Sequence, residues 1–299
     1  MLKKICLYVI LPVVGIFVLF AGLFVINGLV LANREKPISG TTSYPPKPEI
    51  KDTDEIRIMA YNIAKGFIYK GGIKFVDEKT AKQRMIKIAE VIKKEHPDIV
   101  FLSETVFECT PCPVNQITFL AEATGMHSWA FGENYNFGLP FYRIVGGNAI
   151  LSCFPLKLLS NLSLSGQQPF YITKNNRRVL WCSLKIKGEE ILAASVHNDS
   201  HSRKNNLIQT KQLLDYKGNQ KAVMAGDFNA NPERPSIKFI RNSGQFKASY
   251  GGPLTFPAGK AKYKIDFIFA PKQWNLIEHK VIKSKASDHY PVLSVFNLL

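Results

Sequence analysis

The chain has 299 residues and a formal net charge of +16, from 39 Lys and Arg residues against 23 Asp and Glu residues. This length suffices for one large domain or two modest ones, and in either case the chain is long enough to bury a hydrophobic core. The basic excess favours a polyanionic partner, such as nucleic acid or an anionic lipid surface, although basic residues also serve solubility alone.

The N-terminus predicts a membrane helix. Residues 5–32 carry no charged side chain. This stretch is longer than the ~20 residues that cross a bilayer, whereas the apolar region of a cleaved signal peptide has ~7–15. We therefore expect residues 1–33 to form an uncleaved signal-anchor, with Lys3 and Lys4 inside and the rest of the chain outside the cytoplasm. The alternative is secretion after cleavage near residues 30–32.

Residues 34–54 contain four prolines among Ser, Thr and Lys residues. This composition is typical of a stiff, solvated linker. We expect it to hold a domain of residues 55–299 away from the membrane.

Cys109 and Cys112 form a Cys-x-x-Cys sequence. A metal knuckle would need a second pair of ligands with suitable spacing, which the sequence lacks. In an exported protein the pattern favours a local disulfide, with free thiols as the alternative.

From residue 56 onward, short apolar runs alternate with amphipathic segments. The helices that we expect cover residues 80–95, 116–124 and 203–215, with loops over 126–147 and 160–177. The expected strands cover residues 56–62, 98–103, 148–152, 178–186, 190–196, 222–225, 263–269, 275–282 and 291–296. Strands outnumber helices and include a hairpin at residues 187–188. Two mixed sheets packed face to face, with helices outside, fit this order.

Polar residues end or closely follow several of these apolar runs: Asn62, Glu104, His197, Asp227-Phe-Asn229 and Asp288-His289. Alternate positions of an extended segment share a face, so Asp227 and Asn229 are expected to point into one cleft. The alternative is ordinary turn chemistry. Asn62 and Glu104 offer the oxygen ligands that suit Mg²⁺, or they merely cap loops.

His289 suits proton transfer near neutral pH. Asp266 is a lone acid among apolar residues, where a charge is costly unless it is paired. We expect Asp266 to orient His289, as an acceptor orients a catalytic histidine. The alternative is a purely structural Asp–His hydrogen bond.

Taken together and in this order, these residues resemble the endonuclease/exonuclease/phosphatase superfamily over residues 55–297. The motifs that carry the resemblance are Met59-Ala-Tyr-Asn62, Ser103-Glu104, Asn148-Ala-Ile-Leu-Ser152, Gly226-Asp227-Phe-Asn229, Ile265-Asp266-Phe-Ile-Phe269 and Ser287-Asp288-His289. The resemblance implies an α/β fold, a four-layer α/β/β/α sandwich with the site at one end.

The resemblance also implies roles for the site residues. Asn62, Glu104 and Asp288 would hold Mg²⁺, for which Mn²⁺ could substitute. Asp266 would orient His289, Asp227 would handle a proton, and Asn229 and His197 would bind the phosphate. The sequence departs from the family pattern at Cys153, where many members carry Arg, and at Asn198. Arg177 and Arg178 could reach a phosphate or lie solvated at the surface.

These expectations describe a membrane-anchored, Mg²⁺-dependent phosphoesterase, with a nuclease acting on DNA or RNA favoured by the charge. One alternative is a phosphoesterase of lipid headgroups, similar to sphingomyelinases or phosphoinositide phosphatases. Another is a non-catalytic module that binds polyanions. Nothing in the sequence indicates an obligate protein partner.

Overall fold

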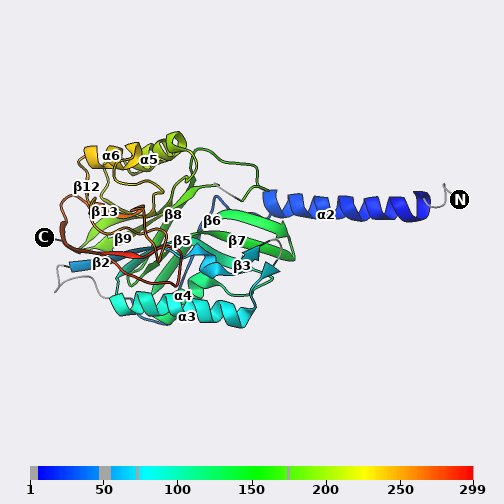
Figure 1. Cartoon of the computed structure of the whole chain (residues 1–299), viewed down its shortest axis with the longest axis horizontal. Coiled ribbons are helices and arrows are strands. Elements are labelled where there is room, and N and C mark those ends of the chain that lie inside the picture. Colours follow the sequence, from blue (N-terminus) through cyan, green and yellow to red (C-terminus); the bar gives the residue numbers. More distant parts are fainter. Residues whose placement is uncertain (1–5, 47–54, 72–73, 174–175, 299) are drawn as a thin grey trace.

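In a computed structural model, two β-sheets pack face to face between layers of helices, and a long helix projects from one end (Figure 1). The structure describes residues 6–46, 55–71, 74–173 and 176–298. The expected four-layer sandwich of two mixed sheets is confirmed.

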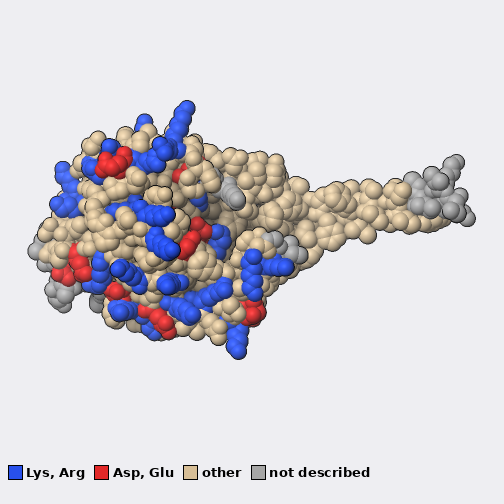
Figure 2. Space-filling model, in the orientation of Figure 1, with Lys and Arg blue, Asp and Glu red and all other residues tan. Residues whose placement is uncertain are grey.

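The projecting helix begins with a π-helical turn, η1 (Cys6–Ile10), and continues as α2 (Leu11–Leu29). Its span Leu7–Leu29 has 23 residues and is long and apolar enough to cross a membrane, a character that a signal sequence would share. Figure 2 shows Lys and Arg side chains spread over the globular part, while the helix carries no charged side chain.

The larger sheet has seven strands, and all neighbours are antiparallel except β2 and β5, which are parallel. Helices α3 (Glu78–Glu95) and α4 (Gln116–Thr124) cover its outer face over an apolar cluster. In spatial order the strands are β1 (Ile38–Thr41), β6 (Ser128–Leu139), β7 (Tyr142–Ser152), β5 (Ile99–Cys109), β2 (Glu55–Asn62), β15 (Val292–Asn297) and β14 (Asn275–Val281).

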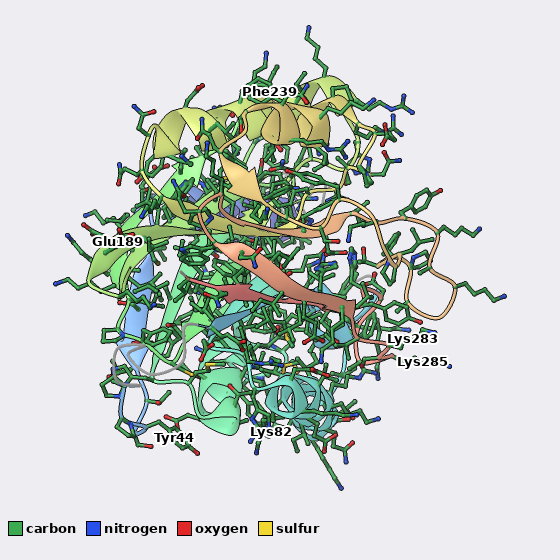
Figure 3. All side chains as sticks on the ribbon, turned by 90° about the vertical axis from the view of Figure 1, so that its left-hand side faces the viewer. Tyr44, Lys82, Glu189, Phe239, Lys283 and Lys285 are labelled. Carbon is green, nitrogen blue, oxygen red and sulfur yellow. The ribbon has the colours of Figure 1, made fainter. Side chains whose placement is uncertain are left out.

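The smaller sheet has six strands, and α5 (Arg203–Lys217) and α6 (Pro235–Asn242) cover its outer face. Figure 3 shows the layers, with Phe239 of α6 on one outer side and Lys82 of α3 on the other. In spatial order the strands are β12 (Phe246–Lys247), β13 (Asp266–Pro271), β11 (Ala222–Asp227), β10 (Glu189–His197), β9 (Arg178–Ile186) and β8 (Lys157–Ser163). A short 3-10 turn, η2 (Ala64–Phe67), and the hairpin β3 (Tyr69–Gly71) and β4 (Lys74–Phe75) lie outside both sheets.

The two sheets share an apolar cluster, and buried hydrogen bonds also join them. Ser195 Oγ donates to the Leu102 carbonyl oxygen at 3.0 Å, and Asn148 Nδ2 donates to the Arg178 carbonyl oxygen at 2.8 Å. Buried polar groups are costly unless paired, so these bonds favour one alignment of the sheets. That alignment sets the spacing between residues at the ends of the strands.

The helix ends follow the local sequence. The Asp77 side chain accepts from Thr80 N at 2.7 Å at the start of α3, and Asn115 accepts from Ile117 N at the start of α4. Such side chains satisfy amide groups that have no partner within the helix. The expected helix over residues 116–124 is confirmed, and it ends because Gly125 adopts the left-handed conformation that favours glycine.

Several expected loops are strands. Residues 126–147 form most of the β6–β7 hairpin, and residues 160–163 belong to β8. Strand β5 does not end at Glu104 but continues to Cys109, and α6 was not expected. The Gly- and Asn-rich sequence of β6 is typical of a loop, but its polar side chains find partners far away in the chain: Asn136 Oδ1 accepts from Asn27 Nδ2 at 2.9 Å.

The expected linker is not a free spacer in its described part. Strand β1 (Ile38–Thr41) pairs with β6, and Thr42 N donates to the His127 carbonyl oxygen at 2.8 Å. Asn33 N donates to Glu133 Oε2 at 3.1 Å. Residues 47–54 lie outside the described residues. The prediction of a free spacer is therefore wrong for residues 38–42 of the expected linker, residues 34–54, because they pair with the globular part.

The expected disulfide is also wrong. Cys109 and Cys112 are free and buried, with Cys112 N donating to the Cys109 carbonyl oxygen at 3.1 Å. Both side chains belong to the apolar cluster beneath α3 and α4. Burial raises the pKa of Cys109 to about 11, so this thiol behaves as a small apolar side chain.

Candidate active site

The strand register brings the expected residues to one end of the sandwich. His197 ends β10, Asp227 ends the parallel strand β11, and these two residues are paired in register. Asp227 is also paired with Asp266, the first residue of the antiparallel strand β13. Asn62 ends β2 in the facing sheet and lies within hydrogen-bonding distance of Asp227. Residues that are far apart in sequence therefore meet because their strands end on the same side.

Gly226 is required for this arrangement. Its φ is +140°, and a Cβ atom there would lie 2.0 Å from the Val196 carbonyl oxygen. Strand β11 can therefore approach β10 closely just before Asp227. After the strand, Asn229 N donates to Asp227 Oδ1 at 2.8 Å, which fixes the carboxylate.

Asp266, His289 and Asp227 form a buried acid–histidine cluster. His289 Nδ1 and Asp266 Oδ2 are 3.0 Å apart, and His289 Nε2 lies 3.7 Å from Asp227 Oδ2. Asn62 Nδ2 donates to Asp227 Oδ2 at 3.1 Å. The Phe256 ring packs on the imidazole with centroids 4.6 Å apart. The predicted pairing of Asp266 with His289 is present, and Asp227 lies on the other side of the same ring.

Burial and charge set the protonation of this cluster. Burial raises the pKa of Asp227, and the Asp266 carboxylate adds to this, although His289 opposes it. Burial alone would lower the pKa of His289, but Asp266 and Asp227 outweigh it and raise that pKa to about 10. The imidazole is thus held as a cation between two acids. Asp227 is the acid whose proton affinity is moved toward neutral pH.

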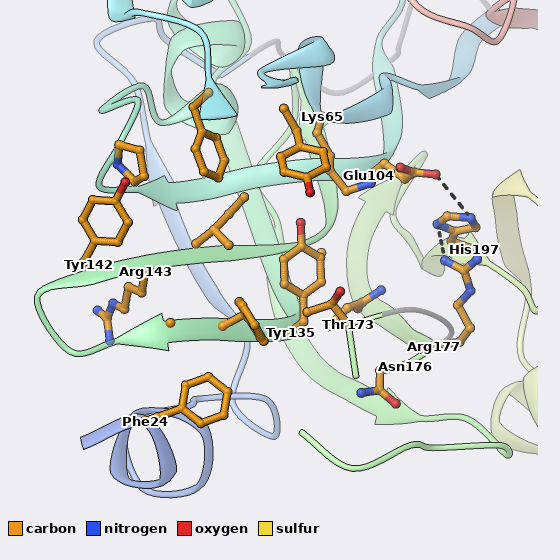
Figure 4. Close-up of a pocket in the computed structure, with 18 of the residues that line it drawn as sticks. Phe24, Lys65, Glu104, Tyr135, Tyr142, Arg143, Thr173, Asn176, Arg177 and His197 are labelled. Carbon is orange, nitrogen blue, oxygen red and sulfur yellow. Dashed lines mark hydrogen bonds and ion pairs between the residues drawn. The ribbon is translucent and has the colours of Figure 1, made fainter. Parts of the chain in front are cut away.

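His197 is the opposite case, a buried neutral histidine. Its Nδ1 lies 2.9 Å from Arg177 Nη1, a group that can only donate, so the ring proton is on Nε2. Burial and the Arg177 charge lower the pKa of His197 well below its ordinary value. Nε2 lies 3.9 Å from Glu104 Oε1 (Figure 4). It also lies 3.6 Å from Asp227 Oδ2. His197 is therefore placed to donate a hydrogen bond at the centre of the site.

Glu104 lies within β5 rather than at its end, at an irregularity of the pairing between Leu102 and Thr105. Its φ of +55° is uncommon for a residue with a side chain, and such positions often belong to functional sites. Asn62 Nδ2 donates to Glu104 Oε1 at 3.3 Å, and Lys65 Nζ forms an ion pair with Oε2. Burial would raise the pKa of Glu104, but the Lys65 ammonium holds it below its usual range.

Lys65 was missing from the residues expected from the sequence. It lies in η2, three residues after Asn62, and has a φ of +54°. Gln116 Nε2 donates to the Lys65 carbonyl oxygen at 2.7 Å, which fixes this turn against α4. The signal available in the sequence was a lysine next to a glycine directly after a site strand.

Asp288 directly precedes His289 in the chain, but unlike His289 it is exposed. Its Oδ1 accepts from Ser287 Oγ at 3.3 Å, and the same hydroxyl is 2.7 Å from the Asn62 carbonyl oxygen. Ser287 therefore joins the loop of Asp288 to the end of β2.

Two groups of residues come into question for a metal ion. Ligand atoms of Asp227, Asp266 and His289 lie within 4.8 Å of one another. However, the side chains of Asp227 and Asp266 are only 2% and 1% exposed, whereas Glu104 is 28% exposed. Mg²⁺ prefers oxygen ligands and keeps several waters. Glu104, with Asn62 beside it, therefore fits such an ion better than the buried cluster, and Ser287 joins Asp288 to Asn62.

This fit requires one local change. The Asn62 side-chain oxygen accepts from Ala64 N at 3.0 Å, and its amide nitrogen faces Glu104. For Asn62 to offer its oxygen to a cation beside Glu104, the amide must turn over.

The expected phosphate-binding residue Asn229 and the open candidate Arg178 both have their side chains bonded to backbone carbonyl oxygens. Asn229 Nδ2 donates to the Asn198 carbonyl oxygen at 3.0 Å, so the contact of Asn229 to the site centre is through its backbone. Arg178 is buried, and its Nη1 donates to the Asn161 carbonyl oxygen at 2.8 Å. Of the two neighbouring arginines, Arg177 is the one that contacts the site.

The site opens into a cavity of about 760 Å³. Lys65, Glu104, Arg177 and His197 line one end, and Phe24 of α2 lies at the other (Figure 4). One end of the cleft thus carries a carboxylate for a cation and cationic donors, and His197 links it to the buried acid–histidine cluster through Asp227.

Comparisons with known proteins agree with this architecture. The family model described as Endonuclease/Exonuclease/phosphatase family matches residues 59–289. None of the curated proteins matches the sequence. An endonuclease/exonuclease/phosphatase structure from Beutenbergia cavernae is similar, with 20% identity and a TM-score of 0.62 over 82% of this chain and 72% of that one.

Two further structures are similar in fold. A mannosyl-6-phosphatase from Bacteroides thetaiotaomicron has 16% identity and a TM-score of 0.59, over 80% of this chain and 98% of that one. The human Nocturnin catalytic domain has 18% identity and a TM-score of 0.56, over 87% and 96% of the two chains. At these identities the likeness concerns the fold.

Proposed function

The chain belongs to the endonuclease/exonuclease/phosphatase family of phosphoesterases, and from this premise we propose that it is a membrane-anchored, divalent-metal-dependent phosphodiesterase. The observation that carries the proposal is the buried cluster of Asp227, Asp266 and His289 directly beside the more exposed Glu104. Proton transfer and cation binding are then neighbouring but separate tasks.

The residues divide the work as follows. Asp227, whose pKa is raised by burial, takes a proton from the attacking water. His289 is held as a cation by Asp266 and lies next to Asp227. It supplies positive charge and the proton that the leaving oxygen takes. His197 Nε2–H and the Lys65 ammonium stabilise the negative charge that develops on the phosphate oxygens.

The reaction is the hydrolysis of a phosphate ester. The water oxygen bonds to phosphorus, the ester P–O bond breaks, and the leaving oxygen takes one proton. Glu104, Asn62 and Asp288 would hold Mg²⁺, or Mn²⁺ as a substitute, and such an ion polarises a phosphate oxygen. Arg177 keeps the His197 proton on Nε2, where it can reach the substrate.

We place α2 across the membrane as a signal-anchor, with the globular part outside the cytoplasm. The length and apolarity of the helix support this. The packing of residues 27–44 on the globular part supports a retained helix rather than a cleaved one, because cleavage near residue 32 would remove Asn27 from its buried contacts.

Nucleic acid is one candidate substrate. The net charge of +16 and the basic side chains seen over the globular part support it (Figure 2). The cleft that leads away from the catalytic residues supports nucleic acid less, because most of its wall is apolar.

The test of the proposed function is hydrolysis of methyl 4-nitrophenyl phosphate by the full chain in nanodiscs. We expect activity with Mg²⁺ and none after EDTA. His289→Ala should lower kcat by about 10²–10⁴-fold, the usual contribution of a general acid or base. The matched control is His127→Gln, since His127 bonds the Tyr44 carbonyl oxygen outside the site. Equal activity of the His289 variant and wild type would refute the role assigned to His289. Plasmid DNA and RNA, assayed alongside, test nucleic acid as the substrate.

A further inference from the structure

The cleft that leads away from the catalytic residues has an apolar middle. Between Glu104 and Phe24 its wall includes the apolar side chains of Phe75, Phe137, Leu139 and Ile144. The cationic residues Lys65 and Arg177 stand at the catalytic end, and Arg143, which lines the cleft farther along, has its guanidinium paired with Glu108. A groove for a nucleic acid strand would carry cationic side chains along its length, because each phosphate of the strand needs one. The arrangement instead suits a ligand with one charged end and one apolar end.

The apolar end of the cleft reaches into the membrane helix. The Phe24 ring lies 5.4 Å from Phe137 and 5.3 Å from Phe170, measured between centroids. Helix α2 ends at Leu29 and rises 1.5 Å per residue, so Phe24 lies about 7–8 Å inside the apolar span. With α2 across a bilayer, this end of the cleft is at the level where lipid tails begin.

The position of the cleft relative to the membrane is fixed by specific contacts. Asn27 is fully buried, and its Nδ2 donates to Asn136 Oδ1 at 2.9 Å and to the Gly138 carbonyl oxygen at 3.0 Å. Gly28 packs so tightly on Phe170 that a Cβ atom would lie 1.9 Å from the ring. The helix is therefore docked on the β6–β7 hairpin, and the mouth of the cleft is held at the membrane.

Apolar side chains are exposed on the same side of the molecule. Phe141, Tyr142 and Tyr171 are 61%, 47% and 55% exposed. Tyr142 lines the cleft beside Arg143 (Figure 4), and Tyr171 packs on Phe170, which contacts Phe24. Aromatic side chains of this kind suit the boundary between headgroups and tails, whereas water would disfavour them.

We propose that the cleft binds the hydrocarbon chain of a membrane lipid that carries a phosphoester. The chain lies along Leu139 and Ile144 toward Phe24, and the phosphate lies between Glu104, His197 and Arg177. The inference rests on the proposed function and adds the class of substrate. The hydrolysis is the one already described, with water as the second reactant and an alcohol and a phosphomonoester as products. The cavity of about 760 Å³ is in the size range of sites that bury small ligands, ~300–1,000 Å³.

The experiment uses a series of alkyl 4-nitrophenyl phosphates with methyl, butyl and octyl chains, hydrolysed by the full chain in nanodiscs. The reacting phosphate and the leaving group stay the same, and only the apolar chain grows. We expect kcat/KM to rise by about two- to fourfold for each methylene that enters the cleft. The methyl ester reports the proposed function alone.

A pair of variants separates binding in the cleft from simple partition into the disc. Leu139→Trp adds bulk inside the cleft, and Leu159→Trp adds the same bulk on β8, where Leu159 is 37% exposed and does not line the cleft. We expect Leu139→Trp to bring the ratio of kcat/KM between the octyl and the methyl ester close to one. We expect Leu159→Trp to keep the gain.

The outcomes separate a failure of the lipid inference from a failure of the proposed function. A wild-type protein that hydrolyses all three esters equally overturns the lipid inference and leaves the proposed function standing. Equal gains in both Trp variants overturn it as well, since partition alone then explains the gain. Efficient cleavage of DNA or RNA with a flat chain-length response assigns the site to nucleic acid instead. Without Mg²⁺-dependent hydrolysis of any ester, the proposed function itself fails.

Discussion

The two ends of the cleft differ in how they are held together. At the catalytic end, Asp266, His289 and Asp227 are buried charges that hold one another in place. At the other end, the uncharged ring of Phe24 packs on the rings of Phe137 and Phe170. Charged contacts fix atoms to within hydrogen-bonding distance, whereas aromatic contacts only shape a surface. The first end is therefore suited to chemistry and the second to a flexible apolar ligand.

The difference also follows the bounds of the family match. The catalytic end lies within residues 59–289, which match the family model. Phe24 and Asn27 precede that match, and Phe24 completes the other end of the cleft. The cleft therefore joins residues of the family match to the helix that precedes it.

The largest expected effect tests the catalytic end. Glu104→Gln removes the exposed carboxylate and with it the charge that we assign to cation binding. We expect kcat/KM for the methyl ester to fall about 100-fold at limiting Mg²⁺ and to recover in part at high Mg²⁺, because the remaining ligands bind the ion more weakly. A Mg²⁺ titration measures this.

The matched control for that change is Glu122→Gln on the exposed side of α4. It should leave the Mg²⁺ titration as in wild type. If Glu104→Gln lowers activity equally at every Mg²⁺ concentration, the cation is held elsewhere, and the buried cluster of Asp227, Asp266 and His289 becomes the first alternative.

The second prediction concerns pH and stability. The folded pKa of His289 is raised to about 10, above the value near 6.5 expected in the unfolded chain. Between these pH values the folded state binds the proton more tightly. The stabilisation is therefore complete below about pH 6.5 and is lost as pH rises toward 10. We expect a loss on the order of 2 kcal/mol over this window, measured by urea unfolding in EDTA.

His289→Gln provides the contrast, because it cannot take up the proton. Its free energy of unfolding should change less with pH over the same window than that of wild type. Parallel pH profiles for the two proteins would show that the ionic contacts of the catalytic end do not stabilise the fold.

The convergence of the catalytic residues was predictable because each follows or begins an apolar strand. Asn62, His197 and Asp227 end their strands, and Asp266 begins one. A run of apolar residues followed by a polar one is visible without knowing which strands pair. The pairing of Asp266 with His289 was predictable for a second reason, since an acid among apolar residues needs a partner.

The remaining features depend on contacts that a local pattern does not contain. Glu104 lies at an irregularity within a strand, and the place of an irregularity follows from the partner strand. Strand β6 looks like a loop because Glu133 and Asn136 are polar, and their partners Arg34 and Asn27 are about a hundred residues away. The linker prediction failed for the same reason, because β1 finds its partner in β6.

The smallest expected effect tests the end of the cleft that Phe24 lines. Asn27→Leu removes the hydrogen bonds to Asn136 and Gly138 and leaves these buried groups without a partner. We expect a loss of about 1–3 kcal/mol in stability, the cost of an unpaired buried polar group, seen as a lower Tm in nanodiscs. The gain of kcat/KM with chain length should shrink, while hydrolysis of the methyl ester stays as in wild type. Val25→Leu, on the exposed side of α2, is the control. An unchanged Tm together with an unchanged chain-length response would mean that the docking of α2 on the hairpin does not shape the cleft, and the two ends would then have to be regarded as independent.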